Sequence, residues 1–219
     1  LIAGFPVHNA IATNKVSSAI GTSMTFTKFL LDGYMPLKLS ACGIFFALIG
    51  SSLGAKTALL ISDYVFKIIM LVILPLTAVY VFKSQNLLKE ERDALPITSR
   101  TFIICSLVAL SMGFYDGFYG PGAGTFMLLL ISGLAKLSIQ KANGVMKAIN
   151  FATNVAALAV YFMNGKVILI VGIIAGLFSV AGNYIGARFF ERGGAKAVRP
   201  VILVVLSLFF MRVIYDLFF

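Results

Sequence analysis

The sequence predicts an all-α integral membrane protein, a polytopic helical bundle of two inverted repeats with a glycine-rich broken or re-entrant helix. Three observations support this fold class. Hydrophobic residues make up 60% of the 219 residues and charged residues only 12%, and the mean hydropathy is +0.99, which is outside the usual range of soluble domains. The chain also matches itself at a shift of 132 positions, and a glycine-rich segment interrupts one apolar run.

Seven apolar runs are long enough to cross a hydrocarbon layer of about 30 Å, which takes roughly 20 helical residues. A shorter run, residues 122–135, fits a half-helix or re-entrant arm better than a full span. The charged stretch 84–100 is a linker between a first repeat, residues 1–83, and a second repeat, residues 101–219. The long runs cover residues 9–31, 36–61, 64–82, 101–119, 142–163, 166–190 and 198–218.

The two repeats align without a gap at the 132-residue shift. Lys15 then falls on Lys147, and Gly33 falls on Gly165. Glycines and lysines match by chance less readily than apolar residues do, so the halves are predicted to be homologous, as in many transporters. The glycine-rich segment maps to positions before Leu1, so the first repeat lacks a counterpart of the leading helix and of that segment in this chain.

The distribution of basic residues predicts the orientation in the membrane. If residues 101–135 leave one face and return to it, the loops on that face carry 11 Lys and Arg, against 3 on the opposite face. Cytoplasmic loops are the basic ones, so the linker 84–100 is predicted to be cytoplasmic and the C-terminus to lie outside. The run 9–31 then enters from outside and its counterpart 142–163 from inside, which makes the repeats inverted.

The segment 113–124 is the most distinctive part of the chain, because it combines closely spaced glycines with Pro121 and a carboxylate. Irregular backbone cannot face hydrocarbon, so it is predicted to line a cavity or to be buried in protein. Proline and glycine both disfavour a helix, which predicts a break here. Close helix packing through small residues is the alternative function. Three glycines lie at the N-terminus of the next half-helix and are expected to offer backbone N–H groups to an anion. They are Gly120, Gly122 and Gly124.

Polar residues within the apolar runs are the candidate binding groups. Lys15 and Lys147 are each about six residues into a run, and inverted halves would bring their ammonium groups around one cavity that suits an anion. Snorkelling to the membrane surface is the alternative. Asp116 is a candidate to carry a proton, and a simple ion pair with either lysine is its alternative role. The neutral donors predicted on the same helical faces are Asn14, Ser18, Asn150, Thr153 and Asn154, for which interhelical packing is the alternative.

Several other functional classes are disfavoured. The net charge of +10 comes from basic residues clustered between apolar runs, which is typical of topology signals and not of a nucleic-acid groove. There is no P-loop, zinc motif or Ser-His-Asp set, so the protein is predicted not to be an enzyme and to need no cofactor. His8 has no second ligand at a suitable spacing, so no metal site is expected.

Three motifs resemble one known family. They are Gly113-Phe-Tyr-Asp-Gly-Phe-Tyr-Gly-Pro-Gly-Ala-Gly-Thr125, then Lys141-Ala-Asn-Gly-Val-Met-Lys147, and Ala12-Thr-Asn-Lys15 in the first half. They resemble the TauE/SafE sulfite exporter family and, within it, the YfcA-like membrane transporters, over essentially the whole chain. The resemblance implies a multi-pass protein of the bacterial inner membrane that moves sulfite, sulfonates or related sulfur-containing anions. One departure is that family members carry a first-half counterpart of the glycine-rich motif, which is absent here.

These observations predict a secondary transporter that exports a small sulfur-containing anion by alternating access. The anion would be held by Asn14, Lys15, Lys147 and Asn150. Two alternatives stay open, namely an uptake permease for another small anion and a non-transporting membrane scaffold or assembly factor. The expected partners are the small anion and the lipid bilayer, with a second copy of the chain in a homodimer as a further candidate; no nucleic acid is expected.

Overall fold

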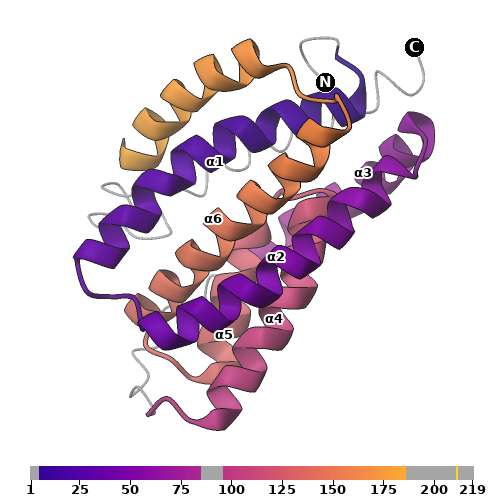
Figure 1. The fold of residues 1–219 in the computed structure, drawn as a ribbon. Helices are drawn as coiled ribbons and strands as arrows, with labels where there is room; N and C mark the ends of the chain where they lie inside the picture. Colours follow the sequence, from indigo (N-terminus) through magenta and orange to yellow (C-terminus); the bar gives the residue numbers. More distant parts are fainter. Residues whose placement is uncertain (1–4, 85–95, 186–210, 212–219) are drawn as a thin grey trace.

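The computed structural model describes residues 5–84, 96–185 and Met211, and within these residues all regular structure is helical. Six helices carry labels in Figure 1, and a further helix, Leu169–Ile185, follows the last of them. This confirms the predicted all-helical fold for the described part of the chain. The labelled helices are α1 (Val7–Leu31), α2 (Leu37–Leu59), α3 (Asp63–Ser84), α4 (Ser99–Phe118), α5 (Ala123–Ala135) and α6 (Ile139–Met163).

The predicted apolar runs coincide with these helices wherever the structure describes them. Among the described helices, α2, α4 and α6 are both long enough and apolar enough to cross a membrane. The helix α1 has the length but carries more polar side chains, and α5 and Leu169–Ile185 are apolar but shorter. The predicted run 198–218, apart from Met211, and residues 85–95 of the predicted linker lie outside the described residues.

Prolines and glycines delimit the long helices. Pro6 and Pro36 directly precede α1 and α2, where proline is tolerated because the N–H it lacks would have no helical partner. Gly33 and Gly165 follow the ends of α1 and α6 with positive φ angles of 73° and 65°. Glycine adopts this left-handed conformation without steric cost, so both helices stop at equivalent signals.

The 132-residue repeat seen in the sequence is also present in the local structure. Adding 132 to the bounds of α1, residues 7 and 31, gives 139 and 163, which are the bounds of α6. Adding 132 to the first residue of α2 gives 169, where the next helix begins. The same offset therefore relates both the sequence and the helix boundaries of the two halves.

The equivalent helices α1 and α6 lie side by side and run antiparallel (Figure 1). Near the start of α1, the Asn9 side chain donates a hydrogen bond to the carbonyl of Lys166, just beyond the end of α6. Further along α1, the Phe26 ring stacks on Phe151 in the middle of α6, with centroids 5.1 Å apart. The start of α1 therefore lies beside the end of α6, and the later part of α1 lies beside the middle of α6, as expected for antiparallel helices.

The helices α2 and α4 pack backbone to backbone through glycines. A Cβ atom on Gly50 would lie 2.2 Å from the carbonyl oxygen of Leu110, and one on Gly54 would lie 2.0 Å from that of Phe114. Any side chain at either position would force the helices apart. Small residues serve this close approach within membranes, where lipid gives helices no hydrophobic drive to associate.

A similar contact joins the helix Leu169–Ile185 to α1. A Cβ atom on Gly172 would lie 2.7 Å from Val16, and one on Gly176 would lie 2.6 Å from Ile20. In the other half, α2 lies against α6, the counterpart of α1. The two equivalent helices, α2 and Leu169–Ile185, thus each pack on a helix of the other half, α6 and α1 respectively.

Apolar side chains cover the outside of the bundle as well as its core. Phe45 and Leu53 on α2, Leu107 on α4 and Val72 on α3 are all more than half exposed. Water would not stabilise such a surface, whereas lipid would. One buried apolar cluster joins α2, α4, α5 and α6, and a second joins α1, α2, α3 and α6.

Candidate functional site

A buried ion pair joins α1 to α4 in the interior of the bundle. The Nζ atom of Lys15 lies 3.0 Å from Oδ1 of Asp116, and the two residues are only 2% and 4% exposed. A buried charge needs a partner because the protein interior solvates it poorly. Of the roles expected for Asp116, the structure shows the neutralisation of Lys15.

Neutral side chains of α6 complete the surroundings of this pair. Lys15 Nζ also donates to Oδ1 of Asn154 at 3.2 Å, and the Thr153 hydroxyl donates to Oδ2 of Asp116. The Ser51 hydroxyl on α2 donates to the carbonyl of Thr153 at 2.6 Å. Four helices therefore meet at one polar centre, and both carboxylate oxygens have donors.

The helix break lies directly beside this centre. The helix α4 ends at Phe118, two residues after Asp116, and α5 begins at Ala123. Gly120 lies between them with a φ of 98°, and a Cβ atom there would lie 3.0 Å from Asp116 Oδ1 and 3.3 Å from Lys15 Nζ. Glycine is required here both by the backbone conformation and by the space that the ion pair occupies.

Two amide side chains lead from the ion pair towards the start of α5. The Nδ2 group of Asn154 donates to Oδ1 of Asn150 at 3.0 Å and to its carbonyl at 2.7 Å. The Nδ2 group of Asn150 in turn lies 3.7 Å from where a Cβ atom of Gly124 would be. Asn150 and Asn154 are one helical turn apart, so α6 presents both on one face.

The first turn of α5 offers donors that the described part of the chain does not use. Gly122 has a left-handed φ of 80° and precedes the helix. The N–H groups of Gly122 and Gly124 have no acceptor among the described residues, whereas the N–H of Gly120 donates to the carbonyl of Tyr115 at 3.2 Å. The prediction of a free N–H at Gly120 is therefore wrong, because the turn that ends α4 uses that donor itself.

The second predicted lysine has different surroundings. Lys147 is partly buried on α6 and, within the described residues, makes no ion pair or side-chain hydrogen bond. It lies three residues before Asn150, on the same side of the helix. Lys15 and Lys147 are equivalent in the repeat, yet only Lys15 has a described carboxylate partner.

Two predicted binding residues lie apart from the ion pair. Asn14 is exposed, and its Nδ2 group makes a long contact of 3.5 Å with the Ser18 hydroxyl. Successive residues of a helix differ by about 100° in direction, so Asn14 points away from the side on which Lys15 is buried. The structure does not bring Asn14 or Ser18 to the polar centre.

The sequence interpretation missed two contributors to the centre. They are Ser51, whose hydroxyl donates to the Thr153 carbonyl, and Tyr161, whose hydroxyl donates to the carbonyl of Gly117 at 3.1 Å. Tyr161 lies seven residues after Asn154, on the same face of α6, and that spacing is the signal that would have identified it. Among the described residues, no three His, Cys, Asp or Glu side chains are grouped to hold a metal ion.

Comparisons with known proteins found one matching family and several related membrane transporters. The sequence model described as sulfite exporter TauE/SafE matches residues 1–213. The chain is 31% identical over 216 residues to a probable membrane transporter protein, ORF9, of Sinorhizobium, which covers 99% of this chain and 82% of the relative. It is 28% identical over 221 residues to the probable membrane transporter protein YfcA of Escherichia coli K12, covering 99% and 79%. No solved structure matches the chain.

Proposed function

Because the chain belongs to the TauE/SafE sulfite exporter family of membrane transporters, we propose that it exports a small sulfur-containing anion, such as sulfite or an organosulfonate. The observation that carries this proposal is the buried Lys15–Asp116 pair beside a helix break. The amides of Asn154 and Asn150 lead from the pair towards that break. Unpaired N–H groups at the N-terminus of a helix favour an anion.

The anion would bind at the start of α5. The N–H groups of Gly122 and Gly124 lie at the N-terminal end of α5, which carries positive partial charge. Asn150 contributes an amide next to Gly124, and Lys147, one turn away, contributes a full charge. An oxyanion has several acceptor oxygens, so it can satisfy these donors together.

Asp116 would control the access of the anion to Lys15. In the described state its carboxylate holds the lysine and both residues are buried, so a second anion cannot reach Lys15. Protonation of Asp116 would release the ammonium group for the substrate. Export of an anion is already driven by an inside-negative potential, by about 2.3 kcal/mol per charge per 100 mV, so a coupled proton would be needed for uptake but optional for export.

Alternating access would arise if the two inverted halves exchange their conformations, so that the site opens first to one side of the membrane and then to the other. The shared bounds of α1 and α6 and their antiparallel course support the inverted relation. The reciprocal packing, α2 on α6 and Leu169–Ile185 on α1, is what a two-fold axis between the halves produces. We place the chain in a bacterial inner membrane with its C-terminus outside, on the basis of the uneven distribution of basic residues.

Flux into and out of proteoliposomes tests this proposal. Vesicles that contain the purified protein would be assayed with sulfite, sulfoacetate, thiosulfate and sulfate, and empty vesicles would serve as the control. We expect sulfite or a sulfonate to move faster than sulfate. Inward flux that requires a proton gradient would favour the uptake permease, and no flux of any anion would favour the non-transporting scaffold.

A further inference from the structure

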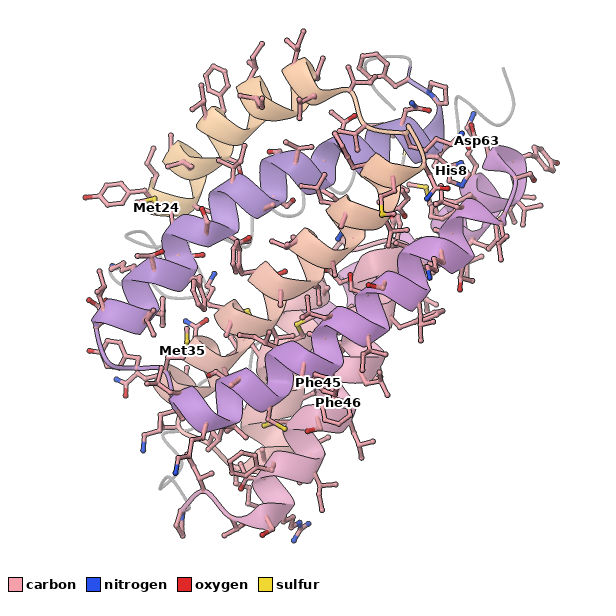
Figure 2. All side chains as sticks on the ribbon, in the orientation of Figure 1. His8, Met24, Met35, Phe45, Phe46 and Asp63 are labelled. Carbon is pink, nitrogen blue, oxygen red and sulfur yellow. The ribbon has the colours of Figure 1, made fainter. Side chains whose placement is uncertain are left out.

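His8 and Asp63 form a second polar contact, away from the centre described above. His8 lies in the first turn of α1, and Asp63 is the first residue of α3. Figure 2 shows the two side chains side by side at the end of the bundle where α1 begins. His8 is buried, whereas the Asp63 side chain is 42% exposed, so the pair connects the interior with the surface.

Both nitrogens of the His8 ring face acceptors. Nε2 lies 2.8 Å from the carbonyl oxygen of Ala58 at the end of α2, and a carbonyl can only accept, so Nε2 carries a hydrogen. Nδ1 contacts Oδ1 of Asp63. A neutral imidazole has a single N–H, so with an ionised Asp63 the second contact would place two lone pairs against each other.

We propose that His8 and Asp63 form a proton-binding site, in which one proton on Nδ1 fastens the start of α1 to α3. Imidazole is a stronger base than a carboxylate in water, so the proton lies on the ring, which then donates to Ala58 and Asp63 at once. When the proton leaves, one of these two contacts becomes repulsive and the first turn of α1 loses an attachment.

Of the three described contacts of the His8 side chain, only the one with Asp63 is with a charged group. The three contacts are the Asp63 carboxylate, the Ala58 carbonyl and the ring of Phe66, which meets His8 edge to face with centroids 5.6 Å apart. The bound proton therefore affects mainly this one ion pair.

The proton site lies on the helix that carries the buried lysine. Lys15 is seven residues after His8, on the same face of one unbroken helix. Phe66 also contacts Tyr119, with centroids 6.2 Å apart, in the break that borders the Lys15–Asp116 pair. Binding of a proton at His8 and Asp63 would thus influence the position of α1. This inference does not depend on whether the protein transports an anion.

The protonation state of the ring tests the proposal directly. The chain has one histidine, so ¹⁵N signals from histidine-labelled protein in detergent micelles report on His8 alone. We expect N–H groups at both ring nitrogens in the wild type at neutral pH, and only Nε2–H in Asp63→Asn, because an amide can donate to a neutral Nδ1. A wild-type ring with a single N–H at neutral pH would overturn the proposal, even if the variant does not fold.

Discussion

Lys15 and Asp116 pair at 3.0 Å although 101 positions separate them in the sequence. The pair holds α1 against the end of α4, where the helix stops and the backbone turns towards α5. Two residues of α6 hydrogen-bond to the pair: Asn154 accepts from Lys15, and the Thr153 hydroxyl donates to Asp116. The polar centre thus depends on charges that compensate each other within the protein.

Removal of the carboxylate should destabilise the fold and expose the lysine to anions. Asp116→Asn leaves a buried ammonium group without a counter-ion, and breaking one partner of a buried pair costs about 3–5 kcal/mol. We expect a lower Tm in detergent, and we expect sulfite to raise the Tm of this variant more than that of the wild type, because the anion can replace the carboxylate.

The matched control for that prediction removes both charges. In the double variant Lys15→Met with Asp116→Asn no buried charge is left unpaired, so most of the lost stability should return and the added effect of sulfite should disappear. The single variants Lys15→Met and Asp116→Asn are measured alongside. If their separate losses of stability add up to the loss in the double variant, Lys15 and Asp116 do not stabilise each other as an ion pair.

Gly120→Ala should disturb both the backbone and the ion pair. An alanine at a φ of 98° is strained, at a cost of roughly 1–2 kcal/mol, and its Cβ would press on Asp116 and Lys15. Gly133→Ala in α5 is the control, because nothing lies within 4 Å of its Cβ position, and alanine there should stabilise the helix by up to about 1 kcal/mol. Thermal unfolding of both variants checks this, and an equal Tm for the two would contradict the role of Gly120.

Asn150→Ala should weaken anion binding without much loss of stability. A hydrogen bond to a charged group contributes about 1.5–3 kcal/mol, which corresponds to a ten- to hundredfold loss of affinity. Asn14→Ala should have no such effect, because Asn14 points away from the polar centre and is exposed. Titration of both purified variants with sulfite tests this geometry. A loss of sulfite affinity in Asn14→Ala but not in Asn150→Ala would place the anion on the other side of α1.

The sequence was sufficient to predict the helices and their interruption. Pro121 and its neighbouring glycines lack helix propensity, and the structure ends α4 and starts α5 on either side of them. The 132-residue shift likewise anticipated that α1 and α6 share their bounds. Both features depend on local backbone preferences, which the sequence expresses directly.

Contacts between helices could not be predicted in this way. Lys15 and Lys147 are equivalent in sequence, so no pattern could show that Asp116 pairs with Lys15. The direction of Asn14 depends on how α1 is rotated against its neighbours. The sequence around His8 offers no partner for its ring, because Asp63 lies 55 positions away. These relationships depend on how the helices pack against one another, and the pattern of apolar and polar residues along one sequence does not specify that packing.

Binding of sulfite or a sulfonate to purified wild-type protein, Lys147→Ala and Lys38→Ala is the most direct test of the proposed anion site. Lys38 is an exposed lysine at the start of α2 and controls for the loss of one positive charge. We predict that Lys147→Ala loses most of the affinity while keeping its fold, and that Lys38→Ala binds like the wild type. Unchanged affinity in Lys147→Ala would contradict the account and would leave Lys147 as a lysine that only extends towards the membrane surface.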